Sequence, residues 1–287
     1  MKPVAFLYHA PESVDAMLAL LAEHGDDGKI LAGGQSLVPT MNFRLARPAR
    51  LFDLNGIAEL DFLRVEGQTL RIGALTRHAA FHRPGVEGPT GKLLSDVVHH
   101  IAHYPIRQRG TFAGSLAHAD PASEWCVVTL TLDGEIVARS KRGVRILKAA
   151  EYFLGVFATT LRTDELVTEV RLPVLDGSWR TGFYEFSRRA GDFAIAMTVA
   201  AIKIEAGKIT QARLGIGGVE DRPLRCQAAE AALIGKVPDA KAFTEAADIV
   251  SRSMNPMQDI HADAAYRRDL VRVVARRALE QAVGAGR

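Results

Sequence analysis

Two short segments combine glycine with hydroxyl and amide side chains. "AGGQS" (residues 32–36) follows an apolar stretch directly, and "GTFAGS" (residues 110–115) lies in a longer run of small residues. Glycine removes Cβ and allows positive φ, so a ligand can approach the main chain, and free N–H groups in such turns suit an anion. The two segments could hold one dinucleotide pyrophosphate between them. They match neither GxGxxG nor GxxxxGK[ST], so the spacing alone also fits two tight structural turns.

Other residues offer chemistry with a simpler explanation. His99 and His103 are four residues apart and would share one face of a helix. No HExxH motif or suitably spaced carboxylate completes a metal site, so we expect no metal in this chain. Arg107 and Arg109 precede the second glycine segment, where they would either offset a pyrophosphate's charge or face a partner subunit.

Composition restricts the class of protein. The 287 residues are 48% hydrophobic and 24% charged, and the net charge of +3 comes from 36 basic and 33 acidic residues that are dispersed along the chain. This argues against nucleic-acid binding. No apolar stretch reaches 18 residues and the N-terminus lacks the apolar core of a signal peptide, so we expect a cytoplasmic protein without stable membrane insertion. Cys126 and Cys226 are too few to hold an iron–sulfur cluster.

Residues 1–55 have the pattern of a β-α-β-turn-β unit. We expect strands at 4–7, 29–32 and 50–54, and a helix that begins after Ser13 and ends at Gly25. Residues 56–175 continue with a hairpin around Gly67, helices at 76–81 and 90–103, two or three strands between 126 and 147, and a strand at 165–173.

The last third changes character. Three antiparallel strands between 180 and 219, with a hairpin turn at Ala206-Gly207, precede helices at 223–235, 240–253 and about 261–283. We therefore expect an α+β protein of two domains. The first would cover residues 1–175, with subdomains of about 1–55 and 56–175, and the second residues 176–287.

The two glycine segments in their longer context are similar to a known family. "AGGQSLVPTMNFRLARP" and "IRQRGTFAGSLAHADPASEW" resemble the FAD-binding medium subunit of the molybdenum hydroxylases, the carbon monoxide dehydrogenase and xanthine dehydrogenase family. The resemblance covers essentially the whole chain, including "SRRAGDFAIA". It implies noncovalent FAD in a vanillyl-alcohol-oxidase (PCMH)-type domain of two α/β subdomains, followed by a smaller C-terminal domain.

The resemblance also implies the residues that contact FAD. Two loops would hold the cofactor, Glu124 would bind its sugar-alcohol region, Ile101 and Phe193 would lie near the flavin ring, and Leu166 or Val167 would make an aliphatic contact. The implied set is Ile30, Leu31, Ala32, Gly33, Gly34, Gln35, Ser36, Leu37, Ile101, Thr111, Ala113, Gly114, Ser115, Glu124, Leu166, Val167 and Phe193.

The sequence departs from this family at specific positions. Ala113 replaces a glycine, which would cost about 1 kcal/mol if φ were positive there. Glu185 lies where relatives often have a lysine near the flavin, Phe193 replaces a tyrosine, and Ile101 lies where some relatives have an aromatic residue.

The function implied by the resemblance is electron transfer. FAD in this chain would take electrons from [2Fe-2S] clusters of a small partner subunit, fed by a molybdopterin cofactor in a large partner subunit, and pass them to an external acceptor. The assembly would be a dimer of heterotrimers. The alternatives are a stand-alone flavin-dependent oxidase of the same fold class and an interaction module without flavin.

Overall fold

The computed structural model describes residues 1–284, which begin with a small parallel sheet of order β1-β3-β2. Its elements are β1 (Leu7–His9), α1 (Val14–His24), β2 (Gly28–Leu31), α2 (Leu37–Asn42) and β3 (Arg50–Asp53). The Ser13 hydroxyl accepts a hydrogen bond from the Ala16 N–H (3.2 Å), as expected for the start of α1. The β-α-β-turn-β prediction is confirmed, except that the first strand covers residues 7–9 rather than 4–7 and the turn contains α2.

An antiparallel sheet of order β4-β5-β10-β6-β7 follows in space. Its strands are β4 (Leu63–Glu66), β5 (Thr69–Gly73), β6 (Glu135–Ser140), β7 (Gly143–Lys148) and β10 (Leu166–Pro173). Gly67, with φ of +60°, is in the β4–β5 turn, so the predicted hairpin is confirmed. β10 comes last of these strands in the sequence and lies at the centre of the sheet, where it pairs with both β5 and β6. It therefore joins residues 63–73 to residues 135–148.

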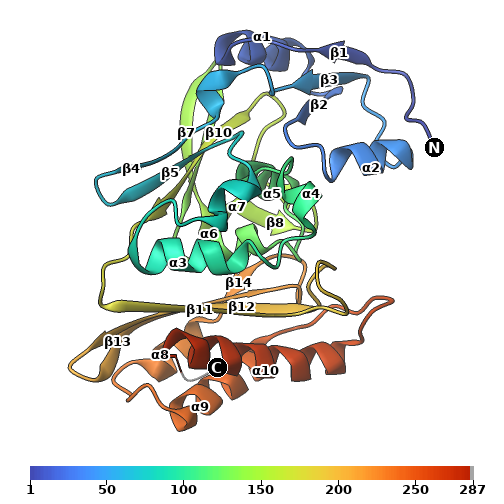
Figure 1. The fold of residues 1–287 in the computed structure, drawn as a ribbon. Helices are drawn as coiled ribbons and strands as arrows, with labels where there is room; N and C mark the ends of the chain where they lie inside the picture. The colour runs from blue at the N-terminus through green and yellow to red at the C-terminus, as the bar shows by residue number, and fades with distance from the viewer. Residues whose placement is uncertain (285–287) are drawn as a thin grey trace.

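Short helices pack between the sheets, as Figure 1 shows. They are η1 (Ala58–Leu60), η2 (His78–His82), α3 (Gly88–Val97), α4 (Tyr104–Arg107), α5 (Phe112–His118), α6 (Glu124–Thr131) and α7 (Ala149–Tyr152), with a small β8 (Phe153–Gly155) and β9 (Ala158–Thr159) hairpin. The strand expected from Cys126 onward is wrong, because these residues form α6. Every residue of α6 is buried, so no periodic pattern distinguishes a helix from a strand.

The C-terminal part is a sheet of order β11-β12-β13-β14 covered on one face by helices. Its elements are β11 (Trp179–Phe186), β12 (Ala196–Glu205), β13 (Lys208–Gly217), β14 (Leu224–Arg225), α8 (Gln227–Leu233), α9 (Ala240–Ser253) and α10 (Ala264–Ala282). The predicted Ala206-Gly207 turn is confirmed, with φ of +49° and +75°. The expected three strands are four, because the short β14 pairs with the end of β13.

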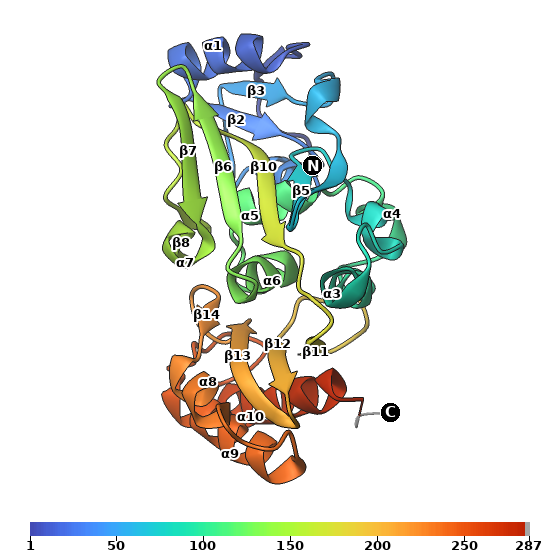
Figure 2. The ribbon, with the colours of Figure 1, turned by 90° about the vertical axis from the view of Figure 1, so that its left-hand side faces the viewer.

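The two parts meet where α3 and α6 lie on the uncovered face of this sheet, a contact layer that we call the seam (Figures 1 and 2). Glycines in β13 allow this approach. A Cβ added at Gly215 would lie 3.1 Å from Cβ of Thr131, and one at Gly217 would overlap the Val127 side chain. The helix α6 therefore rests directly on the sheet backbone.

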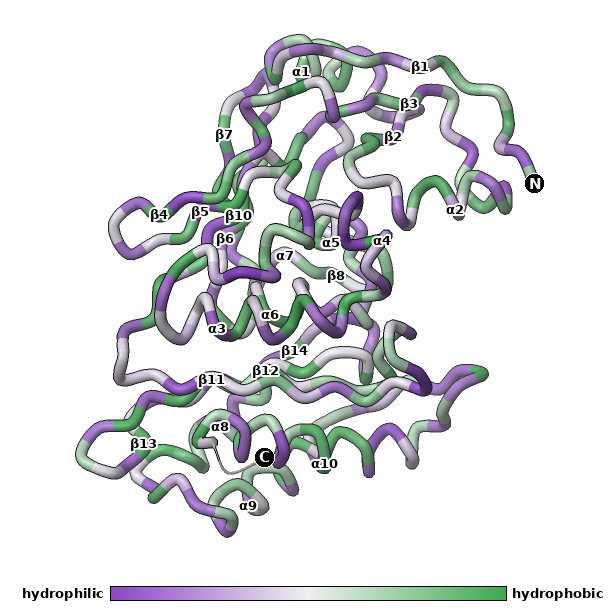
Figure 3. Tube along the Cα trace, in the orientation of Figure 1, coloured by the Kyte–Doolittle hydropathy of each residue, from purple (hydrophilic) through white to green (hydrophobic). Residues whose placement is uncertain are grey.

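Two groups of buried apolar side chains form the core. One runs from α1 through α6 to the seam, and the other lies between the C-terminal sheet and α8, α9 and α10. Trp125 is at the centre of the first, 4.7 Å from the Phe112 ring and 5.2 Å from the Phe81 ring. Along α10 hydropathy alternates between polar and apolar, as expected for a helix buried on one side (Figure 3). Among residues 1–284, every helix is too short or too polar to cross a bilayer.

Candidate functional site

The first glycine segment connects the end of β2 to the start of α2. Gly34 has φ of +71°, a conformation that favours glycine, and its carbonyl accepts a hydrogen bond from Val38 N–H (3.0 Å). The Gln35 amide donates to the Gly33 carbonyl (2.9 Å). Within residues 1–284, the backbone N–H groups of residues 33–36 have no acceptor. These successive donors form a cradle suited to an anion.

The second glycine segment is the first turn of α5, where sequence analysis expected a loop. Thr111 caps this helix, and its Oγ1 accepts a hydrogen bond from Gly114 N–H (3.0 Å). A Cβ at Gly114 would lie 2.6 Å from this hydroxyl, so glycine keeps the cap close. Ala113 does not have a positive φ, so the backbone strain considered for this position in the sequence analysis does not arise. Its N–H has no acceptor within residues 1–284.

The two segments touch through their main chains. A Cβ at Gly33 would lie 2.6 Å from Cα of Gly110 and nearer still to the Arg109 carbonyl oxygen. Gly110 N–H donates to the Ile106 carbonyl (2.8 Å), which holds this part of the second segment in place. The chain therefore brings the two glycine segments into direct contact, which is the arrangement that one dinucleotide held by both would need.

The side chains of Asn55 and Arg77 link the two segments through hydrogen bonds. The sequence analysis did not identify either residue. Asn55 Nδ2 donates to the Ala32 carbonyl (2.9 Å), Arg77 donates to Asn55 Oδ1 (2.5 Å), and Arg77 also donates to the Arg109 carbonyl. Asn55 could have been found, because it follows β3, which is parallel to β2, and the carboxyl ends of parallel strands share one sheet edge. Nothing in the local sequence around Arg77 indicates its role.

Glu124 is the first residue of α6 and only 8% exposed. Burial, with a smaller contribution from the nearby Asp120 carboxylate, raises the pKa of Glu124 to about 7, although a backbone hydrogen bond acts to lower it. The Cys126 thiol donates to the Ser115 carbonyl (3.5 Å), which joins α6 to α5. Glu124 therefore lies one short helix and one turn beyond the second glycine segment.

Glu185 reaches the same region from β11. Burial, with a smaller contribution from the Glu124 carboxylate, raises the pKa of Glu185 to about 9. The Glu185 Oε2 atom is buried without a hydrogen-bond partner among residues 1–284. Glu185 on β11 thus lies within electrostatic range of Glu124 on α6, at the position where the resemblance had led us to note a missing lysine.

The aromatic and aliphatic site residues are distributed around this region. Phe193 is 72% exposed in the β11–β12 loop, while Ile101 is buried. A Cβ at Gly191 would lie 2.5 Å from Cε1 of His103, so this loop packs against the segment that follows Ile101. Leu166 and Val167 are buried in β10, which packs against α5. The half-buried flanking residues of the first segment are Ile30, Leu31 and Leu37.

The expected histidine helix ends earlier than predicted. α3 stops at Val97, so His99 and His103 lie beyond it, and the His99 ring packs edge-on against His82 at 4.9 Å. Arg107 donates to the carbonyls of residues 101 and 102, both 2.8 Å, which gives it a structural contact. In the part of the chain that the structure describes, no three His, Cys, Asp or Glu side chains are grouped to bind a metal.

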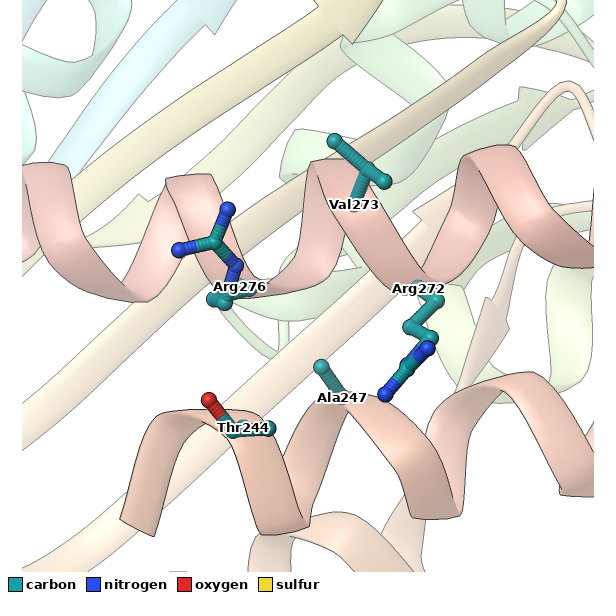
Figure 4. A pocket seen from close by; sticks show the side chains of 5 residues that line it. All are labelled: Thr244, Ala247, Arg272, Val273 and Arg276. Atoms are coloured by element: carbon teal, nitrogen blue, oxygen red, sulfur yellow. The ribbon is translucent and has the colours of Figure 1, made fainter. Parts of the chain in front are cut away.

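A shallow hollow elsewhere has a different character. It lies between α9 and α10, far along the chain from the glycine segments, and Figure 4 shows its side chains. Arg276 is paired with Glu280 (2.7 Å) and Arg272 with Asp248. Because its cations are already paired, this hollow offers no anion site comparable to the two glycine segments.

Comparison with known proteins identifies relatives over the full length. Residues 4–175 match the family model described as FAD binding domain in molybdopterin dehydrogenase, and residues 181–282 match CO dehydrogenase flavoprotein C-terminal domain. The chain is 40% identical to the 6-hydroxypseudooxynicotine dehydrogenase complex subunit alpha of Paenarthrobacter nicotinovorans, covering 99% of this chain and 96% of the relative. It is 32% identical to the carbon monoxide dehydrogenase medium chain of Hydrogenophaga pseudoflava, covering 98% of each.

Solved structures are similar over the same length. A chain of carbon monoxide dehydrogenase from Hydrogenophaga pseudoflava superposes with a TM-score of 0.95 at 35% identity, covering 99% of both chains. A chain of quinoline 2-oxidoreductase from Pseudomonas putida 86 superposes with a TM-score of 0.92 at 34% identity, covering 100% of both. The overall fold of this chain is therefore shared with those two chains.

Proposed function

The chain belongs to the family of FAD-binding medium subunits of molybdenum hydroxylases, and we propose that residues 32–36 and 111–115 hold the pyrophosphate of its FAD. The protein is the FAD-binding, electron-transferring component of a dehydrogenase complex. One observation carries the assignment of the segments. Gly33 contacts the main chain of Arg109 and Gly110, so the N–H groups of residues 33–36, which have no acceptor within residues 1–284, lie beside the second segment, where the Ala113 N–H also has none.

The residues present fit the cofactor. A pyrophosphate needs several hydrogen-bond donors and no side-chain bulk close to them. The glycine segments meet both conditions, since a Cβ at Gly33 would fill the contact between them. The hydroxyl groups of Ser36 and Ser115 add donors beside the backbone N–H groups. FAD itself supplies the redox chemistry, while the chain binds and orients it and excludes water.

The remaining FAD contacts that we assign lie in the region from α5 to the seam. We assign Glu124 to the sugar-alcohol region of FAD, Ile101 and Phe193 to the neighbourhood of the flavin ring, and Leu166 or Val167 to an aliphatic contact. The support is their arrangement from α5 to the seam. Residues 1–175, with subdomains of about 1–55 and 56–175, would form the FAD domain, and residues 176–287 the C-terminal domain.

The partners that we propose are a small subunit with [2Fe-2S] clusters and a large subunit with a molybdopterin cofactor, in a dimer of heterotrimers. Relatives are named as medium chains or as subunits of dehydrogenase complexes. Cys126 and Cys226 are both buried and free, and neither is near enough cysteines to hold a cluster. Free buried thiols also agree with our assignment to the cytoplasm.

Flavin content of the purified complex tests the site. Gly34→Val and Gly114→Val should strip FAD, because a branched side chain would enter the cradle of main-chain donors. Gly235→Val is the matched control, since Gly235 also has positive φ (+79°) but has no atom within 4 Å of an added Cβ and lies after α8. Normal flavin absorbance in both loop variants would contradict the assignment.

Co-purification tests the role in the complex. The chain should be isolated with a small iron-containing chain and a large molybdenum-containing chain, detected by metal analysis of each component. Acid denaturation should release the yellow colour from the precipitate, because the FAD is noncovalent. A single chain that oxidises substrate with its own flavin would identify a stand-alone oxidase and refute the proposed partners.

A further inference from the structure

Two successive carbonyl groups of the first glycine segment are held by side chains. The Asn55 Nδ2 group donates a hydrogen bond to the Ala32 carbonyl (2.9 Å), from a position outside the segment. The Gln35 side-chain amide donates to the Gly33 carbonyl (2.9 Å), from within the segment. The peptide groups that precede Gly33 and follow it are therefore each anchored at the carbonyl oxygen.

An anchored carbonyl also fixes the N–H group of the same peptide. The peptide group is planar and trans, so its C=O and N–H bonds point in opposite directions. The first anchored peptide therefore directs the Gly33 N–H away from the Asn55 side chain, and the second directs the Gly34 N–H away from the Gln35 amide. Neither N–H group has an acceptor within residues 1–284. The two side chains thus determine where two free donors point.

The glycines make this anchoring necessary. A residue without Cβ adopts a wide range of φ and ψ, so a peptide group between two glycines rotates at little cost. Gly34 has φ of +71°, and the Val38 N–H holds only the carbonyl of Gly34 itself (3.0 Å). Without its anchor, the peptide before Gly34 could present its carbonyl oxygen to a phosphate group, which that oxygen would repel.

The Asn55 amide is itself held in one orientation. A guanidinium group can only donate hydrogen bonds, so the oxygen of the amide must face Arg77, which donates to Oδ1 (2.5 Å). The NH₂ end consequently faces the Ala32 carbonyl and Asp53 Oδ1, the latter at 2.5 Å. Asn55 is exposed, but these partners fix its side chain before any ligand binds, and a fixed donor costs less entropy on binding.

We propose that Asn55 and Gln35 are positioning residues, which hold the N–H groups of Gly33 and Gly34 toward the pyrophosphate of FAD. The inference rests on the proposed FAD site, because both N–H groups belong to its first segment. Gln35 serves this site by orienting a main-chain donor of its own segment. Asn55 lies outside both glycine segments and acts through the peptide between Ala32 and Gly33.

The experiment removes each anchor in the intact complex. Asn55→Leu and Gln35→Met keep the approximate size of the side chain and delete its donor. Asn255→Leu is the matched control, since Asn255 is also exposed, lies after α9, and bonds to Glu220 through its backbone N–H rather than its side chain. FAD titration of the deflavinated complexes should give about 10- to 100-fold weaker binding in the two test variants, because each misplaces one hydrogen bond to a charged group. The control should bind as the parent does.

Hydrogen exchange separates positioning from general damage. With saturating FAD, exchange measured by mass spectrometry should be slow for residues 32–36 and 111–115 of the parent, because the cofactor shields both segments. Asn55→Leu should lose this protection at residues 32–36 and keep it at residues 111–115. A side chain that only stabilised the domain would not affect one segment selectively.

The outcomes distinguish the positioning role from the site. Parental FAD affinity in both test variants would overturn the positioning role and leave the site standing, and parental affinity in one would overturn the role of that residue. Weaker affinity with equal loss of protection in both segments would also overturn the role, since the damage would then be general. A parent in which FAD protects neither segment from exchange would overturn the proposed site itself.

Discussion

Gly33→Ala tests whether the contact between the glycine segments creates the cofactor site. The added Cβ would lie 2.4 Å from the Arg109 carbonyl oxygen and 2.6 Å from Cα of Gly110, against an ordinary contact of 3.4 Å or more, so the segments must separate by about 1 Å. Both neighbours at this position are main chain and have no rotamer to change. Overpacking of this kind costs about 1–3 kcal/mol of folding free energy.

The effect on FAD should exceed the effect on stability. A separation of this size prevents one pyrophosphate from reaching both sets of donors in good geometry. Each hydrogen bond to a charged group contributes about 1.5–3 kcal/mol, so losing two would weaken binding by about 3–6 kcal/mol, which is more than 100-fold. Gly34→Ala is a different perturbation, because its added Cβ has contacts of 3.0 and 3.2 Å only to side chains and the cost arises from positive φ.

The assay is FAD titration of the deflavinated complex, followed by flavin fluorescence, with thermal unfolding measured in parallel. Gly177→Ala is the control, since an added Cβ there meets no atom within 4 Å and φ is not positive. We expect parental affinity for the control and loss of affinity for Gly33→Ala. If Gly33→Ala lowers the unfolding temperature but binds FAD as tightly as the parent, the contact is structural only and the reasoning fails.

Three further outcomes follow from individual side chains. Phe193→Ala should retain FAD and change stability by less than about 0.5 kcal/mol, because the ring is 72% exposed, but it should speed oxygen reoxidation of the reduced complex in stopped flow; a parental rate would make Phe193 a packing residue. Arg267→Met should lower the unfolding free energy in denaturant titration by about 3 kcal/mol or more, since Arg267 donates to the Ile195 carbonyl (2.7 Å) and pairs with Asp259 (2.6 Å). The raised pKa values of Glu124 and Glu185 mean that the folded state holds a proton that the unfolded chain loses above about pH 4.5. Stability should therefore fall as pH rises from 5 to 7, by at most about 1.4 kcal/mol per pH unit for one proton, and Glu185→Gln should flatten this slope.

Predictions of caps and turns from the sequence were correct where one or two residues determine the backbone conformation. The cap at Ser13, the hairpin at Gly67 and the turn at Ala206-Gly207 each depend on one or two residues with a specific backbone requirement. The run after Cys126 was mistaken for a strand because burial on all sides removes the periodicity that distinguishes helix from strand. α2 was also missed, since glycine and proline around it suggested an irregular loop.

The candidate site shows the same division. The glycine segments were found because close main-chain approach requires glycine, whatever the tertiary structure. Asn55 and Arg77 were missed because their partners, the carbonyls of Ala32 and Arg109, are 23 and 32 positions away in sequence. The electrostatic influence of Glu124 on Glu185 depends on the docking of α6 against the C-terminal sheet, which no local pattern encodes.

The direct packing of α6 on glycines of β13 limits how the FAD-binding part and the C-terminal part can separate. Apolar side chains of the FAD-binding part and of β12 belong to one buried group, and side chains of α6 lie directly against the glycine backbone of β13. Neither part can expose its inner face without breaking the other's packing. Amide hydrogens of α6 should therefore exchange with solvent only during global unfolding, and the two parts should melt as one cooperative unit.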